Sequence, residues 1–196
     1  MSTTGREPVT VWLSRWRAGR PDALEHIVPL VYDELRQVAR RQLVRESSPH
    51  APSATTLVHE VYLRLLRQRQ VEASDRQEFL AVAGITMRRI LVDEARRRGR
   101  LKRGSDEPVA PFDEERGYVL DDRDLDQVLA LDSVLERLAA ADERAARIVE
   151  YRIFAGFTVD ETAAALGVSA KTVHRTWSTA RAWLRKELAP SHDSRS

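Results

Sequence analysis

Apolar residues recur along this chain at intervals of three and four positions, which is the period of an amphipathic α-helix. One stripe consists of Ile27, Val31, Leu35 and Val38. A denser stripe follows at Leu57, Val58, Val61, Tyr62, Leu65 and Leu66. A long helix is predicted from about residue 75 to residue 100. The residues on its inward-facing side are Phe79, Val82, Ala83, Met87, Ile90 and Leu91. Sustained alternation with a period of two is absent from the sequence, so the pattern predicts an all-α fold.

Proline, glycine and serine mark the breaks between these stripes. Gly19 ends a short helix predicted over residues 11–17, and Pro21 begins the next one. Pro29 is expected to kink or split that second helix near its start, because proline removes a backbone donor and clashes with the preceding turn. Residues 47–52 contain two prolines and two serines and predict a further break.

Charge is distributed unevenly, although 32 basic and 30 acidic residues almost cancel. Residues 88–103 contain eight basic and two acidic side chains, whereas residues 104–126 contain two basic and nine acidic ones. The acidic stretch also contains proline and glycine and has no helical period, which is typical of a linker. We therefore predict two small helical domains, at residues 8–103 and 124–189, joined by an acidic flexible linker at residues 104–123.

Composition indicates a folded protein and narrows the cellular compartment in which we expect it. Hydrophobic residues make up 42% of the 196 positions, which is enough for a packed core. Cysteine is absent, which excludes disulfides and thiolate metal sites and is compatible with a reducing compartment. The longest apolar or glycine run is residues 80–85, far short of the roughly 20 residues that span a bilayer, and residues 1–8 lack a signal-peptide core. We expect a cytoplasmic protein without membrane association.

The most specific local pattern is that of a helix-turn-helix. Thr158 and Glu161 have the spacing of a capping box at the start of one helix. Gly167 tolerates the left-handed turn that joins two such helices, and Ser169 can cap the second one. The order of these signals predicts a helix-turn-helix at residues 158–177.

The second helix of this motif, predicted over residues 170–188, has two faces. Its buried stripe consists of Val173, Trp177, Ala180 and Leu184. The opposite face carries polar and basic side chains near the helix N-terminus, where such groups read base edges in a major groove. The predicted duplex contacts are Ser169, Lys171, Thr172, His174, Arg175 and Ser178. An ordinary helical hairpin with a solvated charged face is the alternative.

The arginine-rich end of the long helix is a second candidate for nucleic-acid binding. Dense cations neutralise phosphates, and affinity then falls steeply with salt. Such runs also occur as solvated helix ends, which the helix dipole favours. Two basic bodies on one chain favour DNA, because together they can hold two separated sites.

These features together resemble bacterial sigma-70 family sigma factors of the extracytoplasmic-function (ECF) subfamily, over about residues 9–188. The helix of that family that docks on RNA polymerase, region 2.2, is similar to Leu57-Val58-His59-Glu60-Val61-Tyr62-Leu63-Arg64-Leu65. Residues 77–100 resemble regions 2.3 and 2.4, which open the −10 element. Residues 125–188 resemble region 4, which reads the −35 element. The sequence resembles one subgroup of the family in particular, at residues 29–36 and 87–96.

The resemblance implies a sigma factor that binds core RNA polymerase and directs promoter-specific transcription initiation. The implied partners are the β′ clamp helices, the β flap and promoter DNA, and an anti-sigma factor is left open. The implied clamp contacts are Leu57, His59, Glu60, Tyr62, Leu63 and Arg64. The implied −10 contacts are Arg76, Thr86, Arg88, Arg89, Arg96, Arg97 and Arg100. The loop at residues 68–76 is our candidate for capturing a base taken out of the stack.

Catalytic chemistry finds no support in the motifs. His59-Glu60 opens a zinc-peptidase motif, but Leu63 occupies the position of its second histidine. Residues 99–104 have the glycine spacing of a phosphate loop, yet Ser105 stands where lysine is required. We therefore expect no enzyme activity, no catalytic residue, no cofactor and no metal site.

Two other non-catalytic classes remain open. One is a stand-alone helix-turn-helix DNA-binding transcription regulator, which would use only the second body and would leave the first without a purpose. The other is a regulator that sequesters a partner protein through the helix at residues 57–66. The density of arginine argues against the second class.

Overall fold

The computed structural model describes residues 8–20, 22–43, 53–68, 73–104 and 122–188. Within these ranges the regular structure is entirely helical, which confirms the predicted all-α class. No helix in this part of the chain is long and apolar enough to cross a membrane. The predicted acidic linker falls mainly on residues 105–121, outside the described residues, as do the side chains of residues 98–104 and 122–127.

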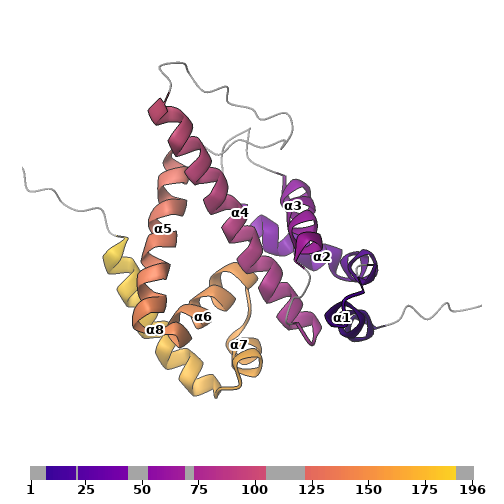
Figure 1. The fold of residues 1–196 in the computed structure, drawn as a ribbon. Coiled ribbons are helices and arrows are strands. Elements are labelled where there is room, and N and C mark those ends of the chain that lie inside the picture. The colour runs from indigo at the N-terminus through magenta and orange to yellow at the C-terminus, as the bar shows by residue number, and fades with distance from the viewer. Residues whose placement is uncertain (1–7, 21, 44–52, 69–72, 105–121, 189–196) are drawn as a thin grey trace, which may run out of the picture.

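Four helices form the N-terminal bundle (Figure 1): α1 (Val9–Arg17), α2 (Ala23–Leu43), α3 (Ala54–Arg67) and α4 (Arg76–Gly104). The long helix α4 packs against α2 and α3. Phe79 and Met87 of α4 are fully buried, and Trp16 of α1 meets the Phe79 ring edge-on with centroids 5.9 Å apart. Each such buried side chain contributes roughly 1.5–3 kcal/mol, so this core is a large part of the stability of the bundle.

Two details of this bundle differ from the sequence-based expectation. Helix α2 continues through Pro29 without the split that was one predicted outcome. The proline removes only the hydrogen bond to the carbonyl of Glu25, and both residues are exposed, so water can satisfy that carbonyl. Leu66 was expected in the buried stripe but is 41% exposed, so the apolar face of α3 is narrower than predicted.

The C-terminal bundle consists of α5 (Asp122–Ala141), α6 (Glu143–Glu150), the π-helical turn η1 (Tyr151–Ala155), α7 (Val159–Leu166) and α8 (Ala170–Glu187). Asp142 separates α5 from α6 and caps α6, its carboxylate accepting a hydrogen bond from the Ala145 N–H at 2.9 Å. Gly156 ends η1 with a φ of 74°. The core of this bundle includes Leu135, Leu138, Val149, Ala180 and Leu184.

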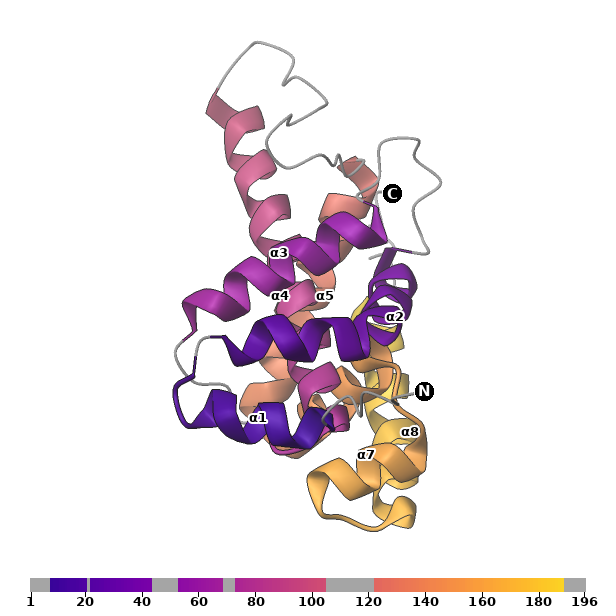
Figure 2. The ribbon, with the colours of Figure 1, turned by 90° about the vertical axis from the view of Figure 1, so that its right-hand side faces the viewer.

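The two bundles pack against each other along α4, as Figure 2 also shows. Helix α4 lies against α5 and contacts η1 and α7. A small apolar cluster crosses the boundary and joins Ala81 of α4 to Tyr151, Ala155 and Phe157. In Figure 1, α1 and α3 lie on one side of α4, and α5, α6 and α8 lie on the other.

Candidate nucleic-acid interface

The predicted helix-turn-helix is present as α7 and α8. The Thr158 hydroxyl accepts a hydrogen bond from the Glu161 N–H at 3.2 Å, and the Glu161 carboxylate accepts one from the Thr158 N–H at 2.7 Å. Gly167 turns the chain with a φ of 63°, and the Ser169 hydroxyl accepts from the Thr172 N–H at 3.1 Å. The capping box, the glycine turn and the second cap are therefore confirmed, and they fix where α8 begins.

One side of α8 packs into the C-terminal bundle. Its buried side chains are, as predicted, Val173, Ala180 and Leu184. Val173 belongs to a buried cluster with Ile148 of α6 and Ala163 of α7. Trp177, predicted in the same stripe, is only partly buried. This packing turns the opposite side of α8 toward solvent.

The solvent side of α8 carries the predicted duplex contacts. Its exposed members are Ser169, Lys171, His174, Arg175 and Ser178. Thr172 is partly buried, and its hydroxyl lies 2.9 Å from the Ser169 hydroxyl within the cap. Cations can hold phosphates, and side chains with several donors or acceptors can read base edges, so the face is chemically suited to a duplex.

An open hollow of about 570 Å³ lies beside this face, between α8 and α6. Arg175 lines it from α8, and Arg144 and Arg147 line it from α6. A hydrogen bond with Tyr151 raises the pKa of the Arg147 guanidinium above its ordinary value, so this group stays charged. The remaining lining residues are Asp142, Glu143, Leu166, Thr172 and Thr176. Three guanidinium groups around one hollow suit a phosphate oxygen as a partner.

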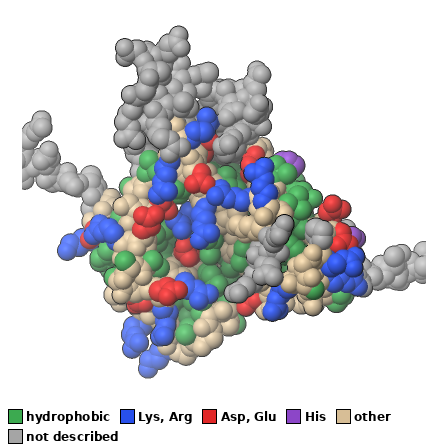
Figure 3. All heavy atoms as spheres, in the orientation of Figure 1, with side chains coloured by type: hydrophobic (Ala, Val, Ile, Leu, Met, Phe, Trp, Pro, Cys, Tyr) green, Lys and Arg blue, Asp and Glu red, His purple; other side chains and the backbone are tan. Residues whose placement is uncertain are grey.

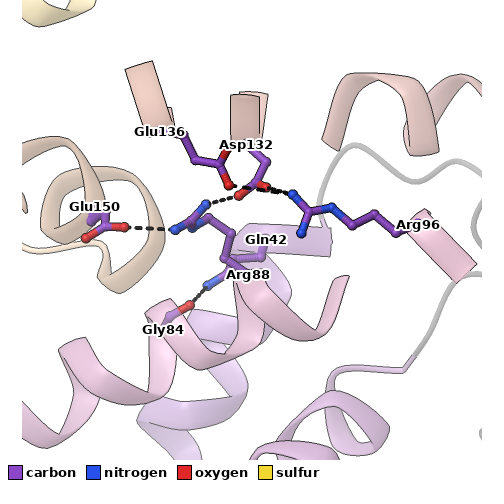
Figure 4. A network of polar contacts seen from close by, with 7 residues as sticks. All are labelled: Gln42, Gly84, Arg88, Arg96, Asp132, Glu136 and Glu150. Atoms are coloured by element: carbon purple, nitrogen blue, oxygen red, sulfur yellow. Dashed lines mark hydrogen bonds and ion pairs between the residues drawn. The ribbon is translucent and has the colours of Figure 1, made fainter. Parts of the chain in front are cut away.

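The arginine-rich side of α4 faces the C-terminal bundle (Figure 4). Arg88 forms ion pairs with Asp132 of α5 and, at 2.9 Å, with Glu150 of α6, and its side chain is only 13% exposed. Arg96 Nη2 lies 2.9 Å from the Asp132 carboxylate and 3.6 Å from that of Glu136. Two of the predicted −10 contacts are thus engaged within the chain. On the surface in Figure 3, basic and acidic side chains accordingly lie side by side over α4 and α5.

The other predicted −10 residues have varied surroundings. Arg76 pairs with a glutamate of α2, and Arg97 pairs with a glutamate of its own helix at 2.8 Å. Thr86 is buried, and its hydroxyl donates to a carbonyl of α4 at 2.8 Å. Arg89 is exposed. Outside the described side chains and residues lie Arg100 and residues 69–72 of the predicted base-capture loop.

The predicted polymerase contacts lie on α3, on the other side of α4 from α5 and α8 (Figure 1). His59 is exposed, and its ring stacks on that of Tyr62 with centroids 6.4 Å apart. The partly exposed members of the set are Glu60, Tyr62, Leu63 and Arg64. Leu57 is fully buried and belongs to the core that supports α3, whereas Leu66 adds an exposed apolar side chain at the end of the helix.

Comparison with family models assigns the chain to a class. The model described as ECF sigma factor matches residues 6–190, which is nearly the whole chain. This chain belongs to the ECF sigma factor family. ECF sigma factors bind DNA and act in transcription initiation, which agrees with the helix-turn-helix built by α7 and α8. A search of the curated proteins found no match.

Two features of this ECF sigma factor could not be predicted from its sequence. The sequence-based set omits Arg144 and Arg147, although both border the same hollow as Arg175. Their spacing of three residues places them on one side of α6, but nothing local indicates that this side meets α8. The engagement of Arg88 by Asp132 also has no sequence signal, because it joins helices on either side of the acidic stretch.

Proposed function

We propose that this sigma factor binds core RNA polymerase through α3 and directs it to promoters with separate −35 and −10 elements. The observation that carries the proposal is the exposed face of α8, which begins at a capped helix N-terminus and borders an arginine-lined hollow. The family match over residues 6–190 supports the role in initiation.

Recognition of the −35 duplex is assigned to α8. Arg175 is exposed and also lines the hollow between α8 and α6. It can therefore reach a guanine edge in the major groove while the DNA backbone passes beside the hollow. Lys171 and Ser178 are suited to phosphates on either side of that base. Arg144 and Arg147 extend the cationic surface from α6 and would add phosphate contacts without sequence preference.

Holding of the −10 strand is assigned to the arginines of α4. Arg89 is exposed and can bind a phosphate directly. Arg88 and Arg96 can do so only after they exchange their carboxylate partners for phosphates. Since each phosphate contact releases counterions, binding of the strand should weaken steeply as salt rises.

Polymerase binding is assigned to α3. Tyr62 and Leu63 are partly exposed beside His59, and Glu60 and Arg64 lie on the same helix. An aromatic and apolar centre with polar side chains around it is the usual composition of a protein–protein interface.

Run-off transcription on a library of genomic promoters, with purified core polymerase, tests the proposed function. The intact chain should co-elute with core enzyme and should select start sites that share −35 and −10 sequences. Leu63→Asp puts a charge into the proposed polymerase surface and should abolish both results. Leu188→Asp changes a 41% exposed leucine just after α8, away from that surface, and should leave both intact.

The same purified protein also tests the main alternative to the proposed function. A chain that ignores core polymerase and binds a palindromic duplex as a dimer would be a stand-alone helix-turn-helix regulator. Size-exclusion chromatography with core polymerase present distinguishes the two, because only a sigma factor moves to the elution volume of the enzyme.

A further inference from the structure

Three arginine side chains converge on the hollow between α6 and α8. Arg144 and Arg147 reach it from α6, and Arg175 reaches it from α8. The two helices pack against each other, as Figure 1 also shows, so guanidinium groups from separate parts of the chain face one space. The hollow thus gathers positive charge that neither helix carries alone.

None of these three arginines forms an ion pair within the described part of the chain. Arg147 is held by a hydrogen bond with the buried Tyr151, which restricts its guanidinium without neutralising it. Many other described arginines do have a carboxylate partner, namely Arg20, Arg64, Arg76, Arg88, Arg96, Arg97 and Arg137. Clustered cations without such partners attract an anion from outside the chain.

Two carboxylates also line the hollow and limit which anions it can hold. Asp142 caps α6 by accepting a hydrogen bond from the Ala145 N–H, and Glu143 is exposed in the first turn of α6. Three basic and two acidic side chains leave only a small positive excess. A ligand must therefore carry several negative charges and bond directly to the guanidinium groups, because diffuse attraction alone is weak here.

The size and chemistry of the hollow suit a compact group of phosphates. Its volume of about 570 Å³ lies within the roughly 300–1,000 Å³ of small-molecule sites. Each phosphate of a DNA backbone carries one negative charge, whereas a terminal phosphate carries about two at neutral pH. A guanidinium can hold two phosphate oxygens at once, and Thr176 adds a hydroxyl from α8. Three guanidinium groups around one space match a diphosphate or triphosphate better than a single backbone phosphate.

We propose that this hollow binds a free diphosphate or triphosphate group, such as that of a nucleotide, and that the bound ligand competes with the −35 duplex for Arg175. The proposal rests on the proposed function of α8, in which Arg175 reads a base. A guanidinium that holds a phosphate in the hollow is not available to a guanine edge. The negative charge of the ligand also repels the DNA backbone, so the ligand weakens duplex binding by two routes.

Binding of the ligand is tested without DNA or polymerase. Isothermal titration calorimetry of the full chain with sodium pyrophosphate, in buffer with EDTA to remove divalent cations, should show one site per chain. Sulfate at equal ionic strength should bind far more weakly. Arg144→Gln with Arg147→Gln should weaken pyrophosphate binding by about tenfold or more, because two charged hydrogen-bond donors are lost. Both side chains are exposed, and circular dichroism checks that the variant is folded.

The matched control is Arg181→Gln with Arg185→Gln. It removes the same charge at two exposed positions of α8 that do not line the hollow. The control should bind pyrophosphate as tightly as wild type. Equal losses in the two double variants would refute the site, because the protein would then attract pyrophosphate only through its net charge.

Competition is tested with a fluorescent −35 duplex from a promoter that the run-off assay selects. ATP in the presence of EDTA should displace this duplex from wild type and from the control at concentrations at which sulfate of equal ionic strength does not. In the Arg144→Gln/Arg147→Gln protein, ATP and sulfate should have the same effect. Failure of ATP to displace the duplex from wild type would refute the competition.

The same measurements separate a free phosphate from the DNA backbone as the occupant. If pyrophosphate binds wild type no better than sulfate does, while Arg144→Gln/Arg147→Gln weakens duplex binding, the hollow serves only the backbone and the inference is wrong. The proposed function is judged separately. It fails if wild type with core polymerase gives no promoter-specific transcript, whether or not pyrophosphate binds.

Discussion

Gly84 of α4 lies directly against the backbone of Phe154 in η1. A Cβ atom at Gly84 would come within 2.9 Å of the Phe154 carbonyl oxygen, which is closer than side chains normally approach. The Gly84 carbonyl accepts a hydrogen bond from the Gln42 amide, which also donates to the Phe154 carbonyl. The close approach of the two bundles thus depends on the missing side chain at one position.

Gly84→Ala should loosen the contact between the bundles, even though alanine favours a helix over glycine by roughly 1 kcal/mol. The added methyl group fits only if η1 moves away from α4. We therefore expect wild type to unfold in one cooperative transition and the variant in two, as measured by differential scanning calorimetry. A single transition at a higher Tm in the variant would show that η1 accommodates the methyl group without loss.

Local signals account for what could be predicted from the sequence. Thr158, Gly167 and Ser169 each act on backbone groups within a few positions, so their roles as caps and turn follow from residue type and spacing. The contact between Gly84 and Phe154 joins distant segments, and a glycine in a helix has no pattern that names its partner. Leu66 shows a limit of this prediction within a single helix, because it was expected in the buried stripe and is exposed. The apolar period indicates which side of a helix is buried, but not how wide the buried face is.

The same reasoning applies to the candidate site. The arginine run predicts cations, yet whether Arg88 meets water, phosphate or carboxylate depends on how α5 and α6 pack. Arg144 and Arg147 likewise lie beside α8 because of how α6 packs against it, and no local pattern in the sequence indicates that packing. The assignment of these side chains to DNA, and of α3 to polymerase, stays a prediction.

Thr158→Ala should lower the free energy of unfolding by about 1 kcal/mol, because it removes the hydroxyl that caps α7. Urea unfolding followed by circular dichroism measures this loss. Thr179→Ala is the matched control, since the Thr179 residue is exposed and its hydroxyl donates to a carbonyl of its own helix without capping a helix N-terminus. Equal losses in the two variants would contradict a special role for the cap.

Arg175→Ala should weaken binding to a preferred −35 duplex by about 1–3 kcal/mol and should relax the preference at one base pair. Competition binding with duplexes changed one base pair at a time measures both effects. Arg181→Ala, an exposed arginine farther along α8, should leave the base preference unaltered. If Arg175→Ala weakens all duplexes equally, the side chain contacts backbone and not a base.

Ser74 and Glu78 meet at the start of α4. The Ser74 hydroxyl donates to the Glu78 carboxylate at 2.6 Å and the Ser74 N–H donates to it at 2.7 Å, and these bonds lower the pKa of Glu78 below its ordinary value. In the unfolded chain this pKa returns to about 4.3. Because the folded pKa is the lower one, the stabilisation is fully present above about pH 4.3 and is lost as the pH falls through the folded value.

Glu78→Gln should therefore lower the free energy of unfolding by about 0.5–1.5 kcal/mol near neutral pH. The difference from wild type should shrink as the medium is made more acidic than the ordinary glutamate pKa, because protonated Glu78 and glutamine are then alike in charge. Urea titrations over a series of pH values measure it. Ser74→Ala keeps the carboxylate and the backbone donor, so it should give a smaller loss with the same pH trend. A difference between wild type and Glu78→Gln that stays constant into strong acid would mean that these hydrogen bonds do not depend on the charge of Glu78.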